Sequence, residues 1–187
     1  MADSEPMNRG LVSYQMLKSP RLCPGSPGRA RLLEAVDEET RAFISGSVLP
    51  GSWYPERLSV AMVHGVVKAL ELNTDAAVRA YFGAQQRAAY NLAYRALLRM
   101  TPTRRLVERA PAFWRRQHTA GELIVASGMQ GSASGRIEGN VYVVDPIYAI
   151  GLAAGIEATL TMTGAKGAKV EERPVGEDTL LLDISWR

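Results

Sequence analysis

The hydrophobic pattern of this sequence changes once, near His118, and that change constrains the fold more than any other feature. Between Trp53 and His118 apolar residues recur at spacings of three, four and seven, as on the buried face of a helix. After His118 apolar and polar residues alternate over short runs, as in strands with one buried face. The pattern predicts an α+β domain in which an N-terminal helical block is followed by an antiparallel sheet of about four strands, with one buried helix packed on the sheet.

Capping residues and prolines divide the helical half. Thr74 is predicted to cap one long helix that ends at Thr101-Pro102, because the residue before a proline is disfavoured in a helix. Pro102 and Pro111 each suit the first turn of a helix, so two short helices are expected next, the second from Pro111 to His118. Three earlier helices are expected at 10–18, 31–44 and 56–72. Residues 1–9 are expected to form a disordered leader, and residues 10–187 a single domain.

The C-terminal half is predicted to run strand, strand, helix, strand, strand. The strands are expected at 122–126, 136–143, 168–172 and 178–186, and the helix runs from Pro146 to Gly164 with Asp145 as its cap. The last strand places Leu180, Leu182, Ile184 and Trp186 on a single face. This face is expected to pack on the helix.

Composition excludes several classes of protein. The one cysteine, Cys23, rules out an internal disulfide framework and a cysteine zinc cluster. The N-terminus lacks the basic and apolar regions of a secretory signal, so a cytoplasmic location is expected. The apolar stretch 146–165 has the length of a membrane span, but Glu157 would cost about 2.5 to 3.5 kcal/mol near its centre. A helix buried in a soluble core explains the same stretch, so no membrane association is expected.

Motifs for catalysis are missing. The sequence has no G-x-S-x-G elbow, and neither of its two histidines, His64 and His118, has further metal ligands at suitable spacing. The glycine-rich stretch 128–135 lacks the lysine of a phosphate-binding P-loop and is expected to be a turn. The chain is therefore predicted not to be an enzyme, and to carry no metal or other cofactor.

Basic residues are concentrated in the second half of the helical block. Residues 79–118 hold nine arginines against one acid, Glu108, although the net charge of the whole chain is only +3. Such asymmetry indicates an anionic partner, although arginines in the last turns of helices are also favoured by the helix dipole. No nucleic-acid-binding motif is present, so an acidic protein is the expected partner. The residues predicted to bind it are Arg95, Arg99, Arg104, Arg105 and Arg109.

Aromatic residues flank the boundary between the helical block and the sheet. A filled core is one explanation for them. The other is a pocket for a small, mostly apolar molecule, since such pockets combine aromatic walls with a few hydroxyl groups. The residues predicted to line this pocket are Trp53, Tyr54, Phe82, Tyr90, Tyr94, Trp114 and Tyr148.

The order of segments resembles a known group of domains. The segments are G-L-V-S-Y-Q-M-L, E-E-T-R-A-F-I-S-G-S-V-L-P-G-S-W-Y-P, R-R-L-V-E-R-A-P-A-F-W-R-R-Q-H-T-A-G-E-L-I-V and a final D-I-S-W. Over about 10–186 they are similar to a paralogous family of uncharacterised myxobacterial proteins related to 4-vinyl-reductase-type, haem-NO-binding and TRAPP-like ligand-binding domains. This resemblance implies a regulatory domain, often dimeric, that senses a small molecule or binds a partner without catalysis.

The sequence departs from these relatives at two places. The haem-binding relatives rely on an axial histidine and a Y-x-S-x-R motif, which Tyr90-Asn91-Leu92-Ala93-Tyr94 does not match. The vinyl-reductase-type relatives often carry cysteines near the last hairpin, where this chain has none.

Two functions are therefore predicted. The first is a regulatory domain that binds a small apolar ligand between helices and sheet; the alternative is a scaffold that docks an acidic partner through the basic segment from Arg79 to Arg116. Apolar surfaces of the C-terminal half would suit a homodimer.

Overall fold

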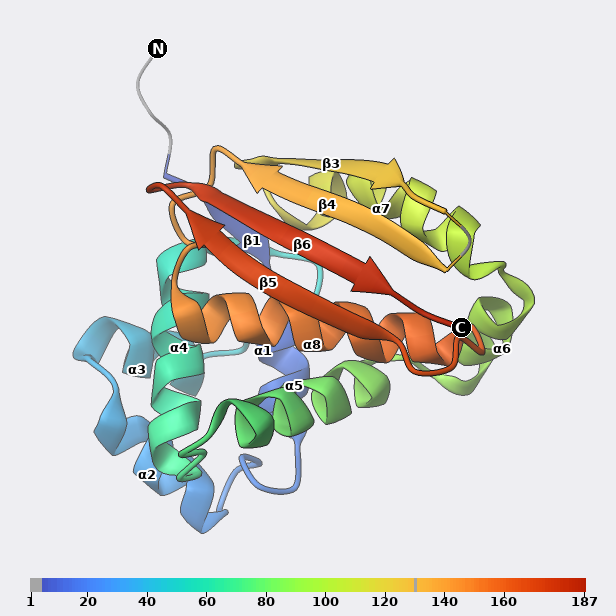
Figure 1. The fold of residues 1–187 in the computed structure, drawn as a ribbon. Coiled ribbons are helices and arrows are strands. Elements are labelled where there is room, and N and C mark those ends of the chain that lie inside the picture. The colour runs from blue at the N-terminus through green and yellow to red at the C-terminus, as the bar shows by residue number, and fades with distance from the viewer. Residues whose placement is uncertain (1–4, 130) are drawn as a thin grey trace.

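The computed structural model describes residues 5–129 and 131–187, and it places a four-stranded antiparallel sheet over layers of helices (Figure 1). The strands are β3 (Glu122–Ser127), β4 (Ser132–Glu138), β5 (Lys169–Val175) and β6 (Thr179–Ser185), in the spatial order β3-β4-β6-β5. Helix α8 (Pro146–Met162) lies beneath the sheet, and α7 (Thr103–Gln117) covers the same face beside β3. The predicted α+β class and the predicted order strand, strand, helix, strand, strand are confirmed.

The N-terminal half contains six helices among its described residues. They are α1 (Leu11–Lys18), α2 (Pro27–Ala35), α3 (Glu38–Ser45), α4 (Glu56–Ala69), α5 (Asp75–Ala89) and α6 (Leu92–Met100). Side-chain oxygens of Ser26, Asp37, Thr74 and Asn91 accept hydrogen bonds from backbone N–H groups at the starts of α2, α3, α5 and α6. These caps satisfy donors that have no partner inside the helix, so they fix where each helix begins.

Two predicted helices are each divided in the structure. The helix expected at 31–44 separates into α2 and α3, because Asp37 leaves the helical conformation and caps α3. The helix expected from Thr74 to Thr101 separates into α5 and α6 at Tyr90 and Asn91. The Asn91 side chain accepts a hydrogen bond of 2.9 Å from the backbone N–H of Tyr94. In both places a good capping residue stops a helix that apolar periodicity alone would continue.

Two further boundaries were predicted wrongly. Pro111 lies inside α7 and does not open a new helix. The helix stays continuous because Val107 and Trp114, on either side of Pro111, are both buried in the core under the sheet. Strand β4 begins at Ser132, within the stretch predicted to be a turn, and ends five residues before the predicted end at Val143. Within this strand Gly135 pairs with Val125 of β3 and with Leu182 of β6.

Part of the predicted leader is a strand. Met7–Arg9 forms β1 and pairs antiparallel with β2 (Trp53–Pro55), so disorder is the wrong prediction for these residues, and residues 1–4 lie outside the described part. The backbone N–H of Thr119 also donates to the carbonyl of Met7 over 2.9 Å. The N-terminal segment therefore joins the helical block to the end of α7.

Helix α8 separates two hydrophobic cores. One core lies among α1 to α5 and reaches α8 through Ile150 and Ala154; the other lies between the sheet, α7 and α8 and includes Ala149 and Ala153. Because both sides of α8 are buried, the helix is apolar around its whole circumference, as its sequence suggested. No helix in the described part of the chain combines the length and apolar character needed to cross a bilayer.

Candidate functional site

The seven aromatic residues predicted to line one pocket lie in separate places. Phe82 and Tyr148 are buried in the core beneath α8, whereas Trp114 is buried in the core under the sheet. Trp53 is partly exposed and lies under the guanidinium of Arg9, with 4.7 Å between the Arg9 Cζ atom and the ring centre. Tyr54 packs edge-on against Phe43. None of the seven lines either of two concavities of the described structure, one at the end of α8 and one on the sheet across β4, β6 and β5.

Tyr90 and Tyr94 form a pair at the break between α5 and α6. Their rings stack with centres 4.8 Å apart and planes inclined by 17°. The Gln86 side-chain amide donates to the Tyr90 hydroxyl over 2.9 Å and to the Thr159 hydroxyl of α8 over 3.2 Å. Burial raises the pKa of the Tyr90 hydroxyl, so this group stays neutral. The stacked pair fixes the direction in which α6 leaves α5.

A buried polar network joins the two halves of the molecule around Glu56. The Glu56 side chain is fully buried, and its Oε1 accepts a hydrogen bond from the Tyr148 hydroxyl over 2.8 Å. His118 Nδ1 lies 3.0 Å from the same oxygen, and the Asn140 amide donates to Oε2 over 3.0 Å. Asn8 extends the network from β1, because its amide donates to the Tyr148 hydroxyl over 3.4 Å. Burial, with a smaller contribution from the charge of Glu56, raises the pKa of Tyr148 well above its usual value.

This network is closed to solvent. The imidazole of His118 stacks on the Trp114 indole at 3.8 Å between ring centres, and the indole N–H of Trp114 donates to the Gly121 carbonyl over 3.0 Å. Glu56, Asn140 and Tyr148 come from α4, the β4–α8 connection and α8. The cluster holds these elements together, and it exposes no carboxylate or imidazole at a concavity where a substrate could bind.

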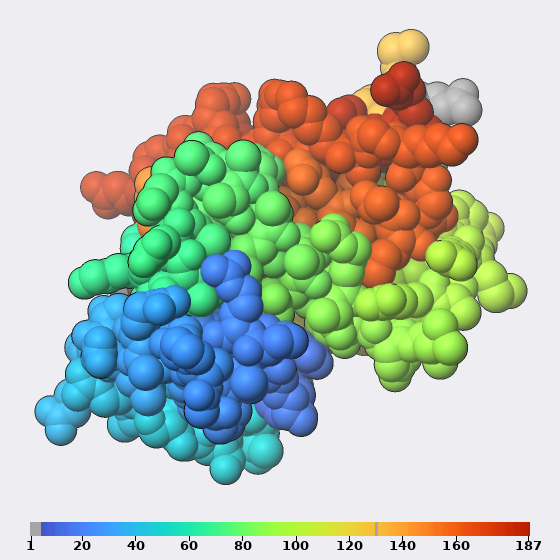
Figure 2. Space-filling view, turned by 90° about the horizontal axis from the view of Figure 1, so that it is seen from below, coloured from blue at the N-terminus to red at the C-terminus, as the bar shows by residue number. Residues whose placement is uncertain are grey.

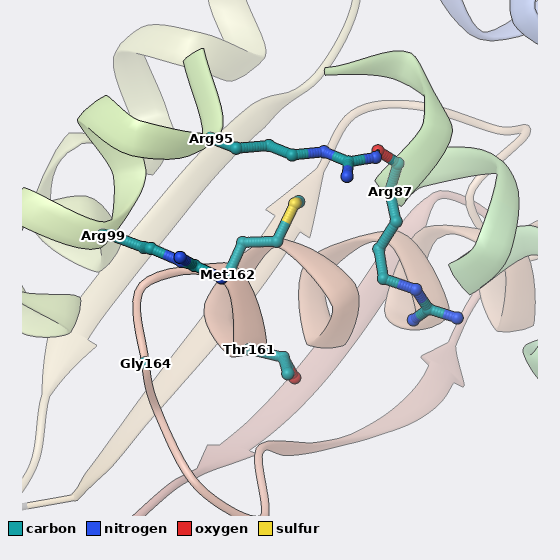
Figure 3. A pocket seen from close by; sticks show the side chains of 6 residues that line it. All are labelled: Arg87, Arg95, Arg99, Thr161, Met162 and Gly164. Atoms are coloured by element: carbon teal, nitrogen blue, oxygen red, sulfur yellow. The ribbon is translucent and has the colours of Figure 1, made fainter. Parts of the chain in front are cut away.

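A cleft lined by arginines lies at the opposite end of α8. We call it the arginine cleft; its volume is about 340 Å³, and it is lined by Arg87, Arg95, Arg99, Thr161, Met162 and Gly164. Arg95 and Arg99 reach from α6 toward the last turn of α8, and Arg87 descends from the end of α5 (Figure 3). Arg95 donates to the carbonyl oxygen of Arg87 over 2.5 Å, which fixes its guanidinium at the rim. No carboxylate of the described residues forms an ion pair with any of these three arginines.

The remaining predicted partner-binding arginines lie on α7. Arg105 and Arg109 are exposed, and Arg104 pairs with Glu108 one turn further along the helix at 3.0 Å. The basic segment does not form one continuous face from Arg79, as the alternative prediction assumed. Arg79 is partly buried and pairs with Glu157 and Glu172, so its charge is used inside the fold. We define the basic face by its five predicted residues, Arg95, Arg99, Arg104, Arg105 and Arg109.

Comparison with solved structures identifies the type of fold. The chain is similar to an Fe(II) unliganded H-NOX protein from K. algicida, with a TM-score of 0.65, 11% identity and 96% of each chain covered. It is also similar to an H-NOX protein from S. oneidensis in the Fe(II)NO ligation state, with a TM-score of 0.64, 12% identity, and 96% of this chain and 99% of that chain covered. A third similar structure is an oxygen-binding H-NOX domain related to soluble guanylate cyclases, with a TM-score of 0.64 and 11% identity over 96% of this chain and 95% of that one.

These likenesses show that the chain has an H-NOX-like fold, which bears out the haem-NO-binding part of the resemblance in its sequence. No protein-family model matches the sequence, and no curated protein matches it. The vinyl-reductase-type and TRAPP-like parts of the resemblance stay predictions.

The residues present do not fit a histidine-ligated haem. His64 is on the surface of α4, and its Nε2 atom lies 2.8 Å from a carboxylate oxygen of Asp145. His118 lies within hydrogen-bonding distance of Glu56 and stacks on Trp114. Neither histidine lines one of the two concavities. The described residues contain no group of three His, Cys, Asp or Glu side chains placed to hold a metal ion.

Sequence reasoning missed two features of the site. In the sequence, Glu56 is simply the first residue of a predicted helix. Its partners His118, Asn140 and Tyr148 lie 62, 84 and 92 residues away, and no nearby residue predicts these contacts. Arg87 is one of the nine arginines of residues 79–118, but it is not among the five predicted to bind a partner. On one continuous helix, Arg87, Arg95 and Arg99 would lie in a row along the same face. Because the helix breaks at Asn91, the three arginines instead line a cleft.

Proposed function

We propose that this chain is a non-catalytic regulatory domain that docks an acidic protein partner through its basic face. The observation that carries the proposal is the exposure of α6, a helix with a single buried side chain, Leu98, among its nine residues. Figure 2 shows α6, in yellow-green, at the margin of the molecule beyond α5 and α8. Most of the surface of α6 is therefore open for a partner to cover.

Helix α6 combines exposed apolar and basic side chains. Leu92 and Met100 are 84% and 83% exposed, and Leu97 is 58% exposed. Arg95 and Arg99 lie between them in sequence, and Arg105 and Arg109 add exposed charge from α7. Protein interfaces commonly combine an apolar centre with a polar rim, and arginine is enriched in them. The charge favours an acidic partner, since positive and negative surfaces steer association.

Charge reversal and apolar substitution on α6 test the proposal. The variant Leu97→Asp/Arg99→Glu is expected to lose capture of an acidic partner from a lysate of the protein's own cells, while its circular dichroism spectrum stays that of the wild type. Arg173→Glu is the matched control, because Arg173 is an exposed arginine on β5, outside the basic face. Equal capture by all three proteins would reject docking through α6.

A small, mostly apolar ligand bound between helices and sheet is the second candidate. The likeness to H-NOX structures supports it, because one of them is an oxygen-binding domain and another is described in an NO-ligated state. The residues proposed to contact such a ligand are still Trp53, Tyr54, Phe82, Tyr90, Tyr94, Trp114 and Tyr148, and because they lie in separate places one ligand would contact only some of them. Native mass spectrometry of the gently purified protein would reveal a bound compound, and a mass equal to that of the bare chain would reject this candidate.

A further inference from the structure

The arginine cleft holds more positive charge than the fold itself uses. Arg87 lies in the last turn of α5, Arg99 lies in the last turn of α6, and Thr161 and Met162 belong to the last turn of α8. A helix C-terminus is equivalent to roughly half a negative charge, but Arg95 lies in the middle of α6, and the positive N-terminus of α6 directly follows the end of α5. The helix ends therefore do not neutralise the three guanidinium groups, and positive charge is left for a ligand.

The last turn of α8 contains no basic residue of its own, so part of the arginine charge complements that helix. No carboxylate of the described residues pairs with the three arginines, so the rest of their charge is not neutralised by an ion pair within the fold. The N-terminus of α7, whose dipole is positive, also lies near the end of α8, since the hydroxyl oxygens of Thr103 and Thr163 are 2.6 Å apart. The potential at this end of α8 is therefore positive.

The positive charge of the cleft matches a phosphate group: Arg95 and Arg99 reach in from α6, and the guanidinium of Arg87 is turned away from them toward Gly83 (Figure 3). We infer that the arginine cleft binds one phosphate group, carried either by a small molecule or by a phosphorylated side chain of a partner. A phosphomonoester has a charge of about −1.5 to −2 at pH 7 and three oxygens that accept strong hydrogen bonds. Guanidinium groups donate paired hydrogen bonds that fit phosphate and carboxylate alike, but a carboxylate has only one negative charge and two oxygens. The positive charge of the three arginines is better matched by a phosphomonoester than by a single carboxylate.

The wall of the cleft at Gly164 allows a ligand to approach the backbone. Gly164 has a positive φ of 96°, and no heavy atom lies within 4 Å of the position where a Cβ would stand. The side chain of Met162 extends between Arg95 and Arg99 in Figure 3 and offers an apolar contact to the rest of the ligand. A volume of about 340 Å³ accommodates a phosphate with a small organic group.

Phosphate binding deepens the proposed docking function, because Arg95 and Arg99 belong to both sites, but the two can be tested separately. Titration calorimetry of the full chain with inorganic phosphate at low ionic strength is expected to show saturable binding at one site. Arg99→Gln should weaken this binding about tenfold or more, since hydrogen bonds to charged groups contribute about 1.5 to 3 kcal/mol. Arg87 acts mainly through its charge, since its guanidinium points away from Arg95 and Arg99 (Figure 3), so Arg87→Gln should weaken binding less than Arg99→Gln does, and Arg87→Lys should weaken it least.

The control variant is Arg173→Gln, which removes one exposed positive charge from β5. Unchanged phosphate affinity in Arg99→Gln, equal weakening by Arg173→Gln, or the lack of saturable binding by the folded wild type would each overturn the inference. Arg95→Gln also removes the hydrogen bond to the Arg87 carbonyl oxygen and can therefore alter the helix. Arg99→Gln does not remove this bond, so it is the decisive variant.

Peptides distinguish the two sources of phosphate. A phosphoserine peptide that binds more tightly than inorganic phosphate indicates a phosphorylated partner, and equal affinities indicate a small phosphorylated ligand; both results support the cleft. A matching peptide with glutamate in place of phosphoserine should bind at least about tenfold more weakly, since it carries less charge and fewer acceptors. Equal binding of the two peptides would overturn phosphate recognition while leaving docking of an acidic partner intact.

Discussion

The two ends of α8 carry polar clusters of opposite kinds. Near its start Tyr148 joins the Glu56 network, in which the carboxylate is fully buried and both of its oxygens accept hydrogen bonds from residues distant in sequence. Near its end the arginine cleft exposes three guanidinium groups without a carboxylate partner among the described residues. A buried polar group is costly unless it is paired, so the first cluster must be complete within the chain. The arginines of the second cluster are exposed to solvent, so they do not need a partner within the chain and are free to bind a ligand.

This difference separates structural from functional use of charge. Glu56 is the more unusual residue, because carboxylates are rarely buried completely. Yet each of its partners comes from the fold, so its role is to hold α4, α8 and the end of α7 together. The arginines are ordinary surface residues taken singly. Their arrangement around one cleft, with positive charge in excess, is what indicates binding.

Removal of the Glu56 carboxylate should have the largest effect. Glu56→Ala leaves His118, Tyr148 and Asn140 without their partner, and each unsatisfied buried group costs about 1 to 3 kcal/mol. We expect the free energy of unfolding, measured with urea, to fall by about 3 kcal/mol or more. Glu108→Ala is the matched control, since its exposed pair with Arg104 should contribute at most about 1 kcal/mol. Similar losses in the two variants would contradict the structural role of the network.

Tyr148→Phe should have an intermediate effect that depends on pH. The variant loses the hydrogen bond to Glu56, which should cost about 1 to 3 kcal/mol at pH 8. Because burial raises the pKa of Tyr148, the folded protein keeps this proton at a pH where the unfolded chain releases it, near pH 10 and above. The stability of the wild type must therefore fall as the pH rises through this range. The Phe variant lacks this loss, so the difference between the two should shrink between pH 8 and pH 11.

Urea unfolding at several pH values measures this difference. The other tyrosines ionise in both proteins, so their contributions cancel in the comparison. A difference in unfolding free energy that stays constant up to pH 11 would show that Tyr148 ionises in the folded protein as readily as in the unfolded chain.

Neutralisation of the cleft should have the smallest effect on stability. Arg95→Gln/Arg99→Gln alters exposed side chains and removes one hydrogen bond to a backbone carbonyl, so the free energy of unfolding should change by no more than about 1 kcal/mol. Added phosphate should raise the melting temperature of the wild type, because a ligand that binds only the folded state stabilises it. The double variant should show no such rise. An equal rise in both proteins would place phosphate binding elsewhere.

The sequence by itself determined the features that depend on neighbours a few residues apart. The caps at Thr74 and Asp145 and the inward face of Leu180, Leu182 and Ile184 are present as predicted, because capping and alternation depend on fixed local spacing. Asn91 and Asp37 show the limit of this reasoning. Both residues cap helices in the structure. The apolar periodicity continues through both positions, so the sequence predicts one helix where the structure has two.

Only the tertiary structure decided which distant residues meet. The partners of Glu56 and the walls of the arginine cleft come from elements far apart in the sequence, and no local pattern encodes such contacts. Packing of α5 and the sheet on opposite sides of α8 brings them together. The same packing buried Phe82, Trp114 and Tyr148 in two separate cores, although their places in the sequence suggested a single pocket.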